Sequence, residues 1–82
     1  MIKVNYSRMG QNNTHTREQV KELIKNWDED RLFVQFGFGW KGARPRKVKD
    51  REEALNYGFF DAFTDDQGNL VLVEYGENDF YW

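Results

Sequence analysis

Hydrophobic and polar residues alternate strictly at the beginning of the chain. Ile2, Val4 and Tyr6 alternate with polar residues, and this period of two predicts a strand with one buried face. The segment 7–16 that follows is mainly polar, so we expect a long loop between this strand and the next element.

A helical period replaces the alternation after residue 16. Thr16 and Gln19 have the spacing of a capping box, in which two side chains satisfy backbone N–H groups at the start of a helix. Apolar residues then recur at positions i, i+3, i+4 and i+7, namely Val20, Leu23, Ile24 and Trp27. This pattern predicts a helix of roughly three turns with one apolar stripe. Residues 28–30 are all acidic, which is unfavourable near a helix C-terminus and favours a turn.

The next segment, LFVQFGFGWK at 32–41, is an aromatic ribbon with two glycines. A strand would give it a buried core face made of Leu32, Val34, Phe36, Phe38 and Trp40. The opposite face would contain Phe33 and Gln35, glycine at 37 and 39, and Lys41. Glycine inside a strand marks a bulge, or the close approach of another backbone or a ligand, and both interpretations stay open.

A short strand and a second helix are predicted next. The turn 42–45 leads into a strand at Arg46–Lys49 with Val48 facing inward. Asp50 and Glu53 again have capping spacing, so we expect a helix that begins at Asp50. Gly58 is a suitable C-cap for this helix in the left-handed conformation.

Two apolar segments, 59–64 and 70–75, flank the sequence DDQGN. Aspartate, glycine and asparagine adopt the unusual dihedral angles of tight turns, so a β-hairpin is predicted. An alternative continues the second helix through Leu55, Phe59 and Phe63, which have i, i+4 spacing, although Gly58 and the turn favour strands. The predicted order is β-α-β-β-α-β-β. It describes a single compact α+β domain over residues 1–82, with a largely antiparallel sheet packed by one or two helices.

Composition removes several classes of function. The 82-residue chain has no cysteine and one histidine, so disulfides, thiolate nucleophiles and cysteine-ligated metal sites are excluded. His15 lies in a polar loop and Ser7 is the only serine, which leaves no supported Ser-His-Asp triad. The start of the chain lacks the apolar segment of a signal peptide, and we therefore expect a cytoplasmic protein.

No cofactor or metal motif is present either. Asp65, Asp66 and Asn69 resemble part of a calcium loop, but Gly76 occupies the position where such a loop has a glutamate. The only GxG sequence, at 37–39, lies within a predicted strand instead of opening a helix. We predict a noncatalytic protein without cofactor or metal.

Charged residues are divided unequally along the chain. All 12 lysines and arginines lie between Lys3 and Arg51, where six acids reduce the formal charge to +6. Residues 52–82 contain eight acids and no base, which gives −8. Pairing between the two halves in the fold would neutralise these charges; without it, each half offers a charged surface to a partner.

The first hypothesis assigns protein binding to the acidic half. Aromatic anchors surrounded by carboxylates suit a basic groove, because the acids steer the encounter while the rings provide buried contact. In size and composition the chain resembles small phage or mobile-element inhibitors and host-defence antagonists, a resemblance that implies a host protein as partner. The candidate residues are Asp61, Asp65, Asp66, Glu74, Glu77, Asp79, Phe80, Tyr81 and Trp82. The three terminal aromatics could instead pack against the core.

The second hypothesis assigns the basic segment to a nucleotide, a cyclic nucleotide or a short nucleic acid. Arginine offers a planar fork to phosphate, and an aromatic ring beside glycine can stack a base. The candidate residues are Phe33, Trp40, Lys41, Arg44, Arg46, Lys47, Lys49 and Arg51. The acidic pI of about 5.3 argues against general duplex binding.

Overall fold

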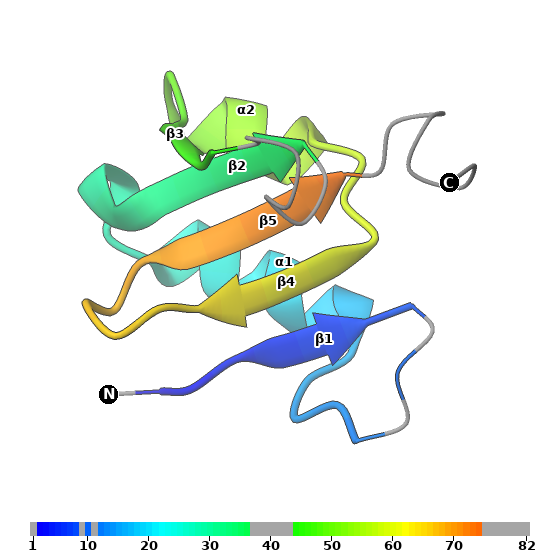
Figure 1. Cartoon of the computed structure of the whole chain (residues 1–82). Helices are drawn as coiled ribbons and strands as arrows, with labels where there is room; N and C mark the ends of the chain where they lie inside the picture. The colour runs from blue at the N-terminus through cyan, green and yellow to red at the C-terminus, as the bar shows by residue number, and fades with distance from the viewer. Residues whose placement is uncertain (1, 9, 11, 37–43, 75–82) are drawn as a thin grey trace.

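The computed structural model describes residues 2–8, 10, 12–36 and 44–74. Its elements are β1 (Asn5–Ser7), α1 (Arg17–Asn26), the 3₁₀ turn η1 (Glu29–Arg31), β2 (Leu32–Phe36), β3 (Arg46–Lys47), α2 (Arg51–Asn56), β4 (Asp61–Thr64) and β5 (Leu70–Glu74). The strands form one sheet in the order β1-β4-β5-β2-β3 (Figure 1). Only β2 and β5 pair in parallel, and the other neighbours are antiparallel. The predicted α+β class and order of elements are confirmed.

The helix α1 forms as its sequence predicts. The Thr16 hydroxyl accepts a hydrogen bond from the Gln19 N–H, and the Gln19 side chain accepts one from the Thr16 N–H at 2.8 Å. The helix ends at Asn26, and Trp27 follows in an extended conformation. Val20 and Ile24 on the predicted apolar stripe are fully buried.

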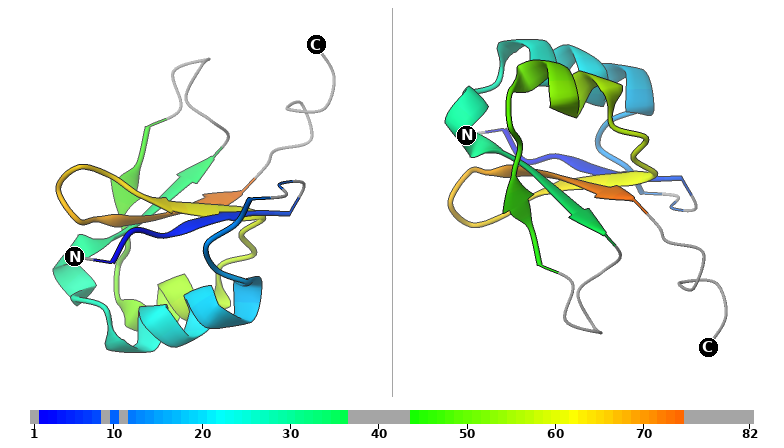
Figure 2. Two further views of the ribbon diagram at one scale, coloured as in Figure 1. Left: turned by 90° about the horizontal axis from the view of Figure 1, so that it is seen from below. Right: turned by 90° about the horizontal axis from the view of Figure 1, so that it is seen from above.

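In the described residues, an apolar core lies between the helices and the sheet. Figure 2 shows that α1 and α2 cover the same face. Tyr6, Ala62, Leu72 and Val34 are neighbours in register across β1, β4, β5 and β2, and they contribute to this core. Its largest fully buried side chain is Phe59, whose ring meets that of Tyr6 edge to face at 6.0 Å. Val48 also points inward, as predicted, and is 3 % exposed.

Two residues predicted to be buried are instead exposed. Ile2 is 53 % exposed because it precedes β1, whose pairing begins at Asn5. Phe36 is 59 % exposed, although it lies on the same side of β2 as the buried Leu32 and Val34. The end of β2 turns away from the helices (Figure 2), so the helical layer does not cover Phe36. The predicted continuation of this strand through Phe38 and Trp40 lies outside the described residues.

The second helix ends differently from the prediction. Tyr57 is its C-cap, with extended backbone and an N–H that donates to the Ala54 carbonyl at 3.3 Å. Gly58 has no positive φ, so its predicted left-handed role is wrong. The rival helix through Phe63 is wrong as well, because β4 begins at Asp61. The predicted strands at 46–49 and 59–64 are shortened to Arg46–Lys47 and Asp61–Thr64.

The predicted hairpin joins β4 to β5. The Asp65 N–H donates to the Asn69 carbonyl at 3.1 Å, and the Gly68 N–H donates to the Asp65 carbonyl at 3.2 Å. Gly68 has a φ of 80°, in the left-handed region that a side chain disfavours. This glycine is therefore required by the turn.

We expect Gly68→Ala to lower the free energy of unfolding by about 1–2 kcal/mol, the usual cost of placing a Cβ in the left-handed region. Gly58→Ala is the matched control, because an added Cβ there meets nothing within 4 Å. Chemical denaturation measures both changes. Equal losses in the two variants would contradict the assigned role of Gly68.

Both described edges of the sheet are blunted. The Asn5 N–H donates to the Thr14 hydroxyl at 2.9 Å, and the Thr14 N–H donates to the Asn5 carbonyl at 2.8 Å. The Ser7 N–H donates to the side-chain oxygen of Asn13, and the side-chain N–H of Asn13 donates to the Ser7 carbonyl, each at 2.9 Å. At the other edge, β3 is two residues long and both are basic. Neither edge, as far as the structure describes it, offers a long unpaired strand to another chain.

Candidate functional site

The acidic candidates do not form one described surface. Asp65 and Asp66 lie in the hairpin before β5, whereas Glu74 ends that strand, about 13 Å from its first residue at the usual rise. Asp61 is only 6 % exposed, and its carboxylate accepts a hydrogen bond from the Arg8 N–H at 3.3 Å. Burial removes Asp61 from any docking surface. The remaining candidates, Glu77, Asp79, Phe80, Tyr81 and Trp82, lie outside the described residues.

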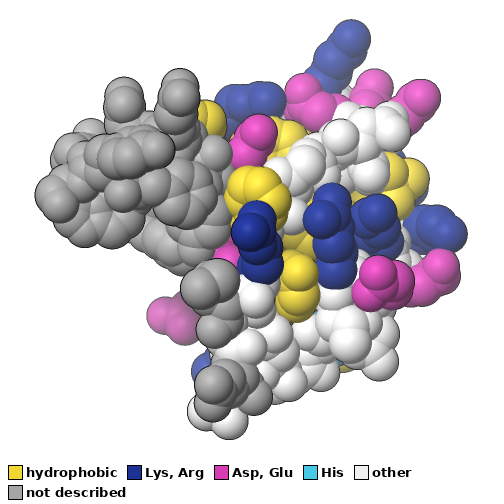
Figure 3. All heavy atoms as spheres, turned by 90° about the vertical axis from the view of Figure 1, so that its right-hand side faces the viewer, with side chains coloured by type: hydrophobic (Ala, Val, Ile, Leu, Met, Phe, Trp, Pro, Cys, Tyr) yellow, Lys and Arg dark blue, Asp and Glu magenta, His cyan; other side chains and the backbone are white. Residues whose placement is uncertain are grey.

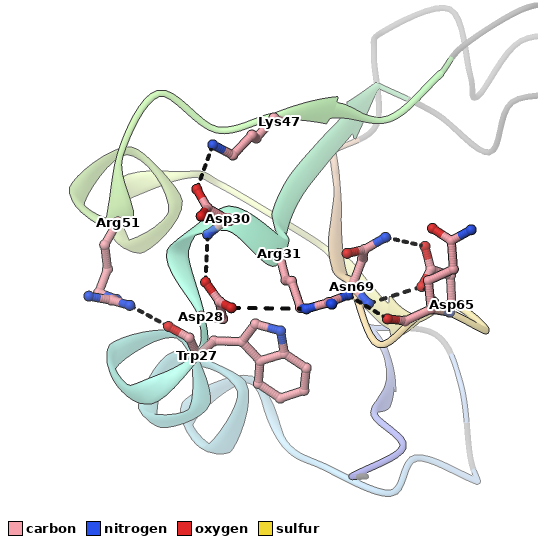
Figure 4. Close-up of polar contacts among 9 residues, drawn as sticks. Trp27, Asp28, Asp30, Arg31, Lys47, Arg51, Asp65 and Asn69 are labelled. Atoms are coloured by element: carbon pink, nitrogen blue, oxygen red, sulfur yellow. Dashed lines mark hydrogen bonds and ion pairs between the residues drawn. The ribbon is translucent and has the colours of Figure 1, made fainter.

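Asp65 has a structural task in the hairpin turn. Its carboxylate accepts hydrogen bonds from the N–H groups of Gln67 and Asn69 and from the Asn69 side chain, each at 2.9 Å (Figure 4). Desolvation raises the pKa of Asp65, but the hydrogen bonds from Asn69 and Gln67 outweigh it and leave the pKa below its ordinary value. The ionised carboxylate therefore stabilises the turn.

We expect Asp65→Asn to lower the free energy of unfolding by about 1 kcal/mol near neutral pH, because hydrogen bonds to a charged group are stronger than those to an amide. Since folding lowers this pKa, the stabilisation is present above the unfolded value of about 3.9 and is lost as the pH falls through the folded value. Wild type and variant should therefore converge in acid.

Denaturation at a series of pH values measures this convergence. Asp66→Asn is the control, because the described structure shows no hydrogen bond to the Asp66 carboxylate. A difference between wild type and Asp65→Asn that persists unchanged into acid would contradict the role given to the charge.

The ends of β2 and β5 bring together an exposed ring and a carboxylate. Phe36 and Glu74 are partners in the parallel register. The Glu74 carboxylate lies close enough to Tyr57 for its negative charge to act on the Tyr57 hydroxyl. Burial, and then the charge of Glu74, raise the pKa of Tyr57 to about 12, so the hydroxyl remains a donor at neutral pH. We call Phe36, Tyr57 and Glu74 the Phe36 surface.

The Phe36 surface has the chemistry of a protein contact. A large ring that is 59 % exposed is available for burial by a partner, and the adjacent carboxylate can attract a basic group. The chain also continues from Glu74 directly into the acidic and aromatic sequence YGENDFYW. Phe36 was predicted to lie in the core. Its exposure makes it a further candidate for protein binding, beside the acidic residues.

The basic candidates have separate partners in the described structure. Arg46 forms an ion pair with Glu53 at 3.2 Å, and Lys47 forms one with Asp30 at 2.9 Å. Arg51 instead donates to the carbonyl of Trp27 at the end of α1 (Figure 4). These three cations therefore do not converge on one ligand.

The other basic candidates do not form a phosphate-binding site in the described residues either. Arg44 and Lys49 are exposed, and no ion pair to either is seen in the segments that the structure describes. Phe33 is half-buried and lies opposite Lys47 in the β2–β3 register. Trp40 and Lys41 lie outside the described residues. Nucleotide binding by the segment 41–51 stays a prediction.

A different group of cations, which the sequence interpretation missed, lies near two aromatic rings. The Arg8 guanidinium lies 5.0 Å from the centre of the Phe60 ring, and the Arg17 guanidinium lies 5.2 Å from that of Phe59. Lys21 follows Arg17 by one helical turn. Figure 3 shows lysine and arginine side chains beside hydrophobic ones on this side of the molecule. Only the spacing of Arg17 and Lys21 could have been found from the sequence.

Within the described residues, no three histidine, cysteine, aspartate or glutamate side chains are placed to hold a metal ion. No helix in the same residues is long and apolar enough to cross a membrane. Comparisons with protein-family models, curated proteins and solved structures find no match to this chain.

Proposed function

We propose that the protein is a noncatalytic inhibitor that binds a basic surface of a host protein. The observation that supports this function is the exposed ring of Phe36 beside the carboxylate of Glu74. This pair lies where the chain enters its acidic and aromatic C-terminal sequence. A phage or mobile-element origin, with action in the host cytoplasm, fits a small binding protein of this composition.

The expected mode of binding is through side chains. Addition of a partner strand would need an open sheet edge, whereas the described edges are occupied by Asn13 and Thr14 or limited to the two residues of β3. Phe36 would supply the buried anchor. Glu74, Glu77 and Asp79 would supply the attraction to basic groups, which raises the rate of encounter more than the strength of the final complex.

Affinity capture from a bacterial lysate tests this function when it is done with paired variants. Phe36→Ala should remove a specifically captured protein, because truncation of a central aromatic anchor commonly costs 2 kcal/mol or more, roughly thirtyfold in affinity. Ile2→Ala is the matched control, since Ile2 is similarly exposed but lies beside Thr64 and Asp65 near the opposite end of the sheet. Equal capture by both variants would contradict the assignment of the Phe36 surface.

A further inference from the structure

Three cations, two in the N-terminal half of α1 and one directly after β1, have side chains without an ion pair in the described residues. Arg8, Arg17 and Lys21 form no ion pair within the described residues, whereas Lys25 on the same helix is paired with Glu22 at 3.0 Å. Arg17 and Lys21 are one turn apart, about 6 Å along the helix axis. We call Arg8, Arg17 and Lys21 the α1 basic face.

The two arginines are held by aromatic rings. Arg8 stacks on Phe60 and Arg17 on Phe59, at 5.0 and 5.2 Å from the ring centres. These rings are consecutive in the chain, and the Arg8 N–H also donates to the Phe60 carbonyl at 2.9 Å. Contact with a ring uses the flat side of a guanidinium and leaves its N–H edge for an oxyanion. The arginines therefore have limited freedom before any ligand arrives, which lowers the entropy cost of binding.

One polar atom of this face lacks a partner. Arg17 Nε is buried and has no hydrogen bond, although a buried donor ordinarily has one. The Phe59 ring compensates for only part of the lost hydration, because such contacts are weaker than a hydrogen bond to an anion. Because Nε itself is buried, an oxygen anion would bind Arg17 through the terminal N–H groups of its guanidinium.

A hollow beside Arg17 has room for more than a simple ion. Its volume is about 390 Å³, and it is lined by Tyr6, His15, Arg17, Glu18 and other residues of 13–19. Small-molecule sites in proteins span about 300–1,000 Å³. The lining offers rings and hydrogen-bonding side chains next to Arg17.

We propose that the α1 basic face binds a small phosphate ester of mononucleotide size, independently of the Phe36 surface. The phosphate would bind the Arg17 guanidinium, which lines the hollow, and the organic part would occupy the hollow. Arg8 and Lys21 would add positive charge to this region. A long nucleic acid fits less well, because Glu18 and Glu22 on the same helix and the net charge of −2 repel a continuous phosphate backbone.

Calorimetric titration of the full chain with AMP, and amide chemical shifts recorded during the same titration, test this site. We expect saturable binding that weakens with added salt, with shifts at residues 8, 14–21 and 59–60. Arg17→Gln and Lys21→Ala should each weaken AMP binding by about tenfold, as for loss of one charge-assisted contact. Lys21→Ala leaves both ring contacts intact, so its effect cannot be attributed to unfolding.

Two further variants sharpen the test. Lys25→Ala removes a paired cation from the same helix and should leave AMP affinity unchanged. Glu18→Gln removes a negative charge from the hollow and should strengthen binding. The site is contradicted by the absence of saturable AMP binding, by shifts confined to 44–51, or by unchanged affinity in both Arg17→Gln and Lys21→Ala. Stronger binding of a single-stranded oligonucleotide than of AMP by the same residues would overturn the assigned ligand class.

Discussion

Phe59→Ala is expected to lower the free energy of unfolding by about 3–5 kcal/mol, the usual cost of removing a fully buried aromatic ring. Phe59 is 0 % exposed, and its ring contacts both the ring of Tyr6 and the guanidinium of Arg17. Such a loss is a large share of the total stability of a domain this small, which is about 5–10 kcal/mol. Chemical denaturation monitored by tryptophan fluorescence measures the change.

Phe36→Ala is the matched control for this substitution. Phe36 carries the same side chain but is 59 % exposed, so we expect its loss to change the free energy of unfolding by less than about 1 kcal/mol. A large loss at Phe36 together with a small loss at Phe59 would reverse the assignment of core and surface. It would also remove Phe36 as a binding anchor, because a residue needed for folding is unavailable to a partner.

Arg51→Met is expected to destabilise the protein by about 2–3 kcal/mol, because it removes hydrogen bonds from a charged donor to partly buried carbonyls. The Arg51 side chain donates to the Ile24 carbonyl at 3.1 Å and to that of Trp27. It thereby caps the end of α1 from the first turn of α2. Methionine keeps most of the apolar stem, so the measured loss reports on the guanidinium group.

Arg46→Met is the control for Arg51→Met. Arg46 pairs with Glu53 at the surface, and an exposed ion pair contributes only about 0–1 kcal/mol. Thermal or chemical denaturation of the two variants separates these cases. Similar losses would show that Arg51 acts as an ordinary surface charge.

Local signals predict much of this fold. The capping box at Thr16, the apolar period of α1 and the turn at 65–69 depend on residues close together in the sequence. They specify those elements with little help from the rest of the chain. The alternation of Leu32 and Val34 similarly predicts the side of β2 that joins the apolar core, although Gln35 on the other side is buried as well.

Tertiary position decides what these local signals leave open. The period that predicts Leu32 as core also predicts Phe36 as core, and only the limited reach of the helical layer separates them. The adjacent acids Asp65 and Asp66 look alike in the sequence, but the Asp65 carboxylate accepts hydrogen bonds from backbone N–H groups of the turn. Arg51 belongs to the basic segment by composition, and yet its partners lie at 24 and 27. The net charge of each half of the sequence is therefore a poor guide to which charged side chains are available to a partner. That depends on the contacts each side chain makes in the fold.

The association rate with the captured host protein tests the central claim most directly. If the acidic end of the sheet docks on a basic surface, association should slow as salt rises from about 0.1 M to 1 M, because the screening length falls from about 10 Å to about 3 Å. Replacing Glu77 and Asp79 by lysine should lower the association rate by about tenfold or more and change dissociation less. Surface plasmon resonance measures both rates. An association rate that is unaffected by salt and by this charge reversal would contradict the claim.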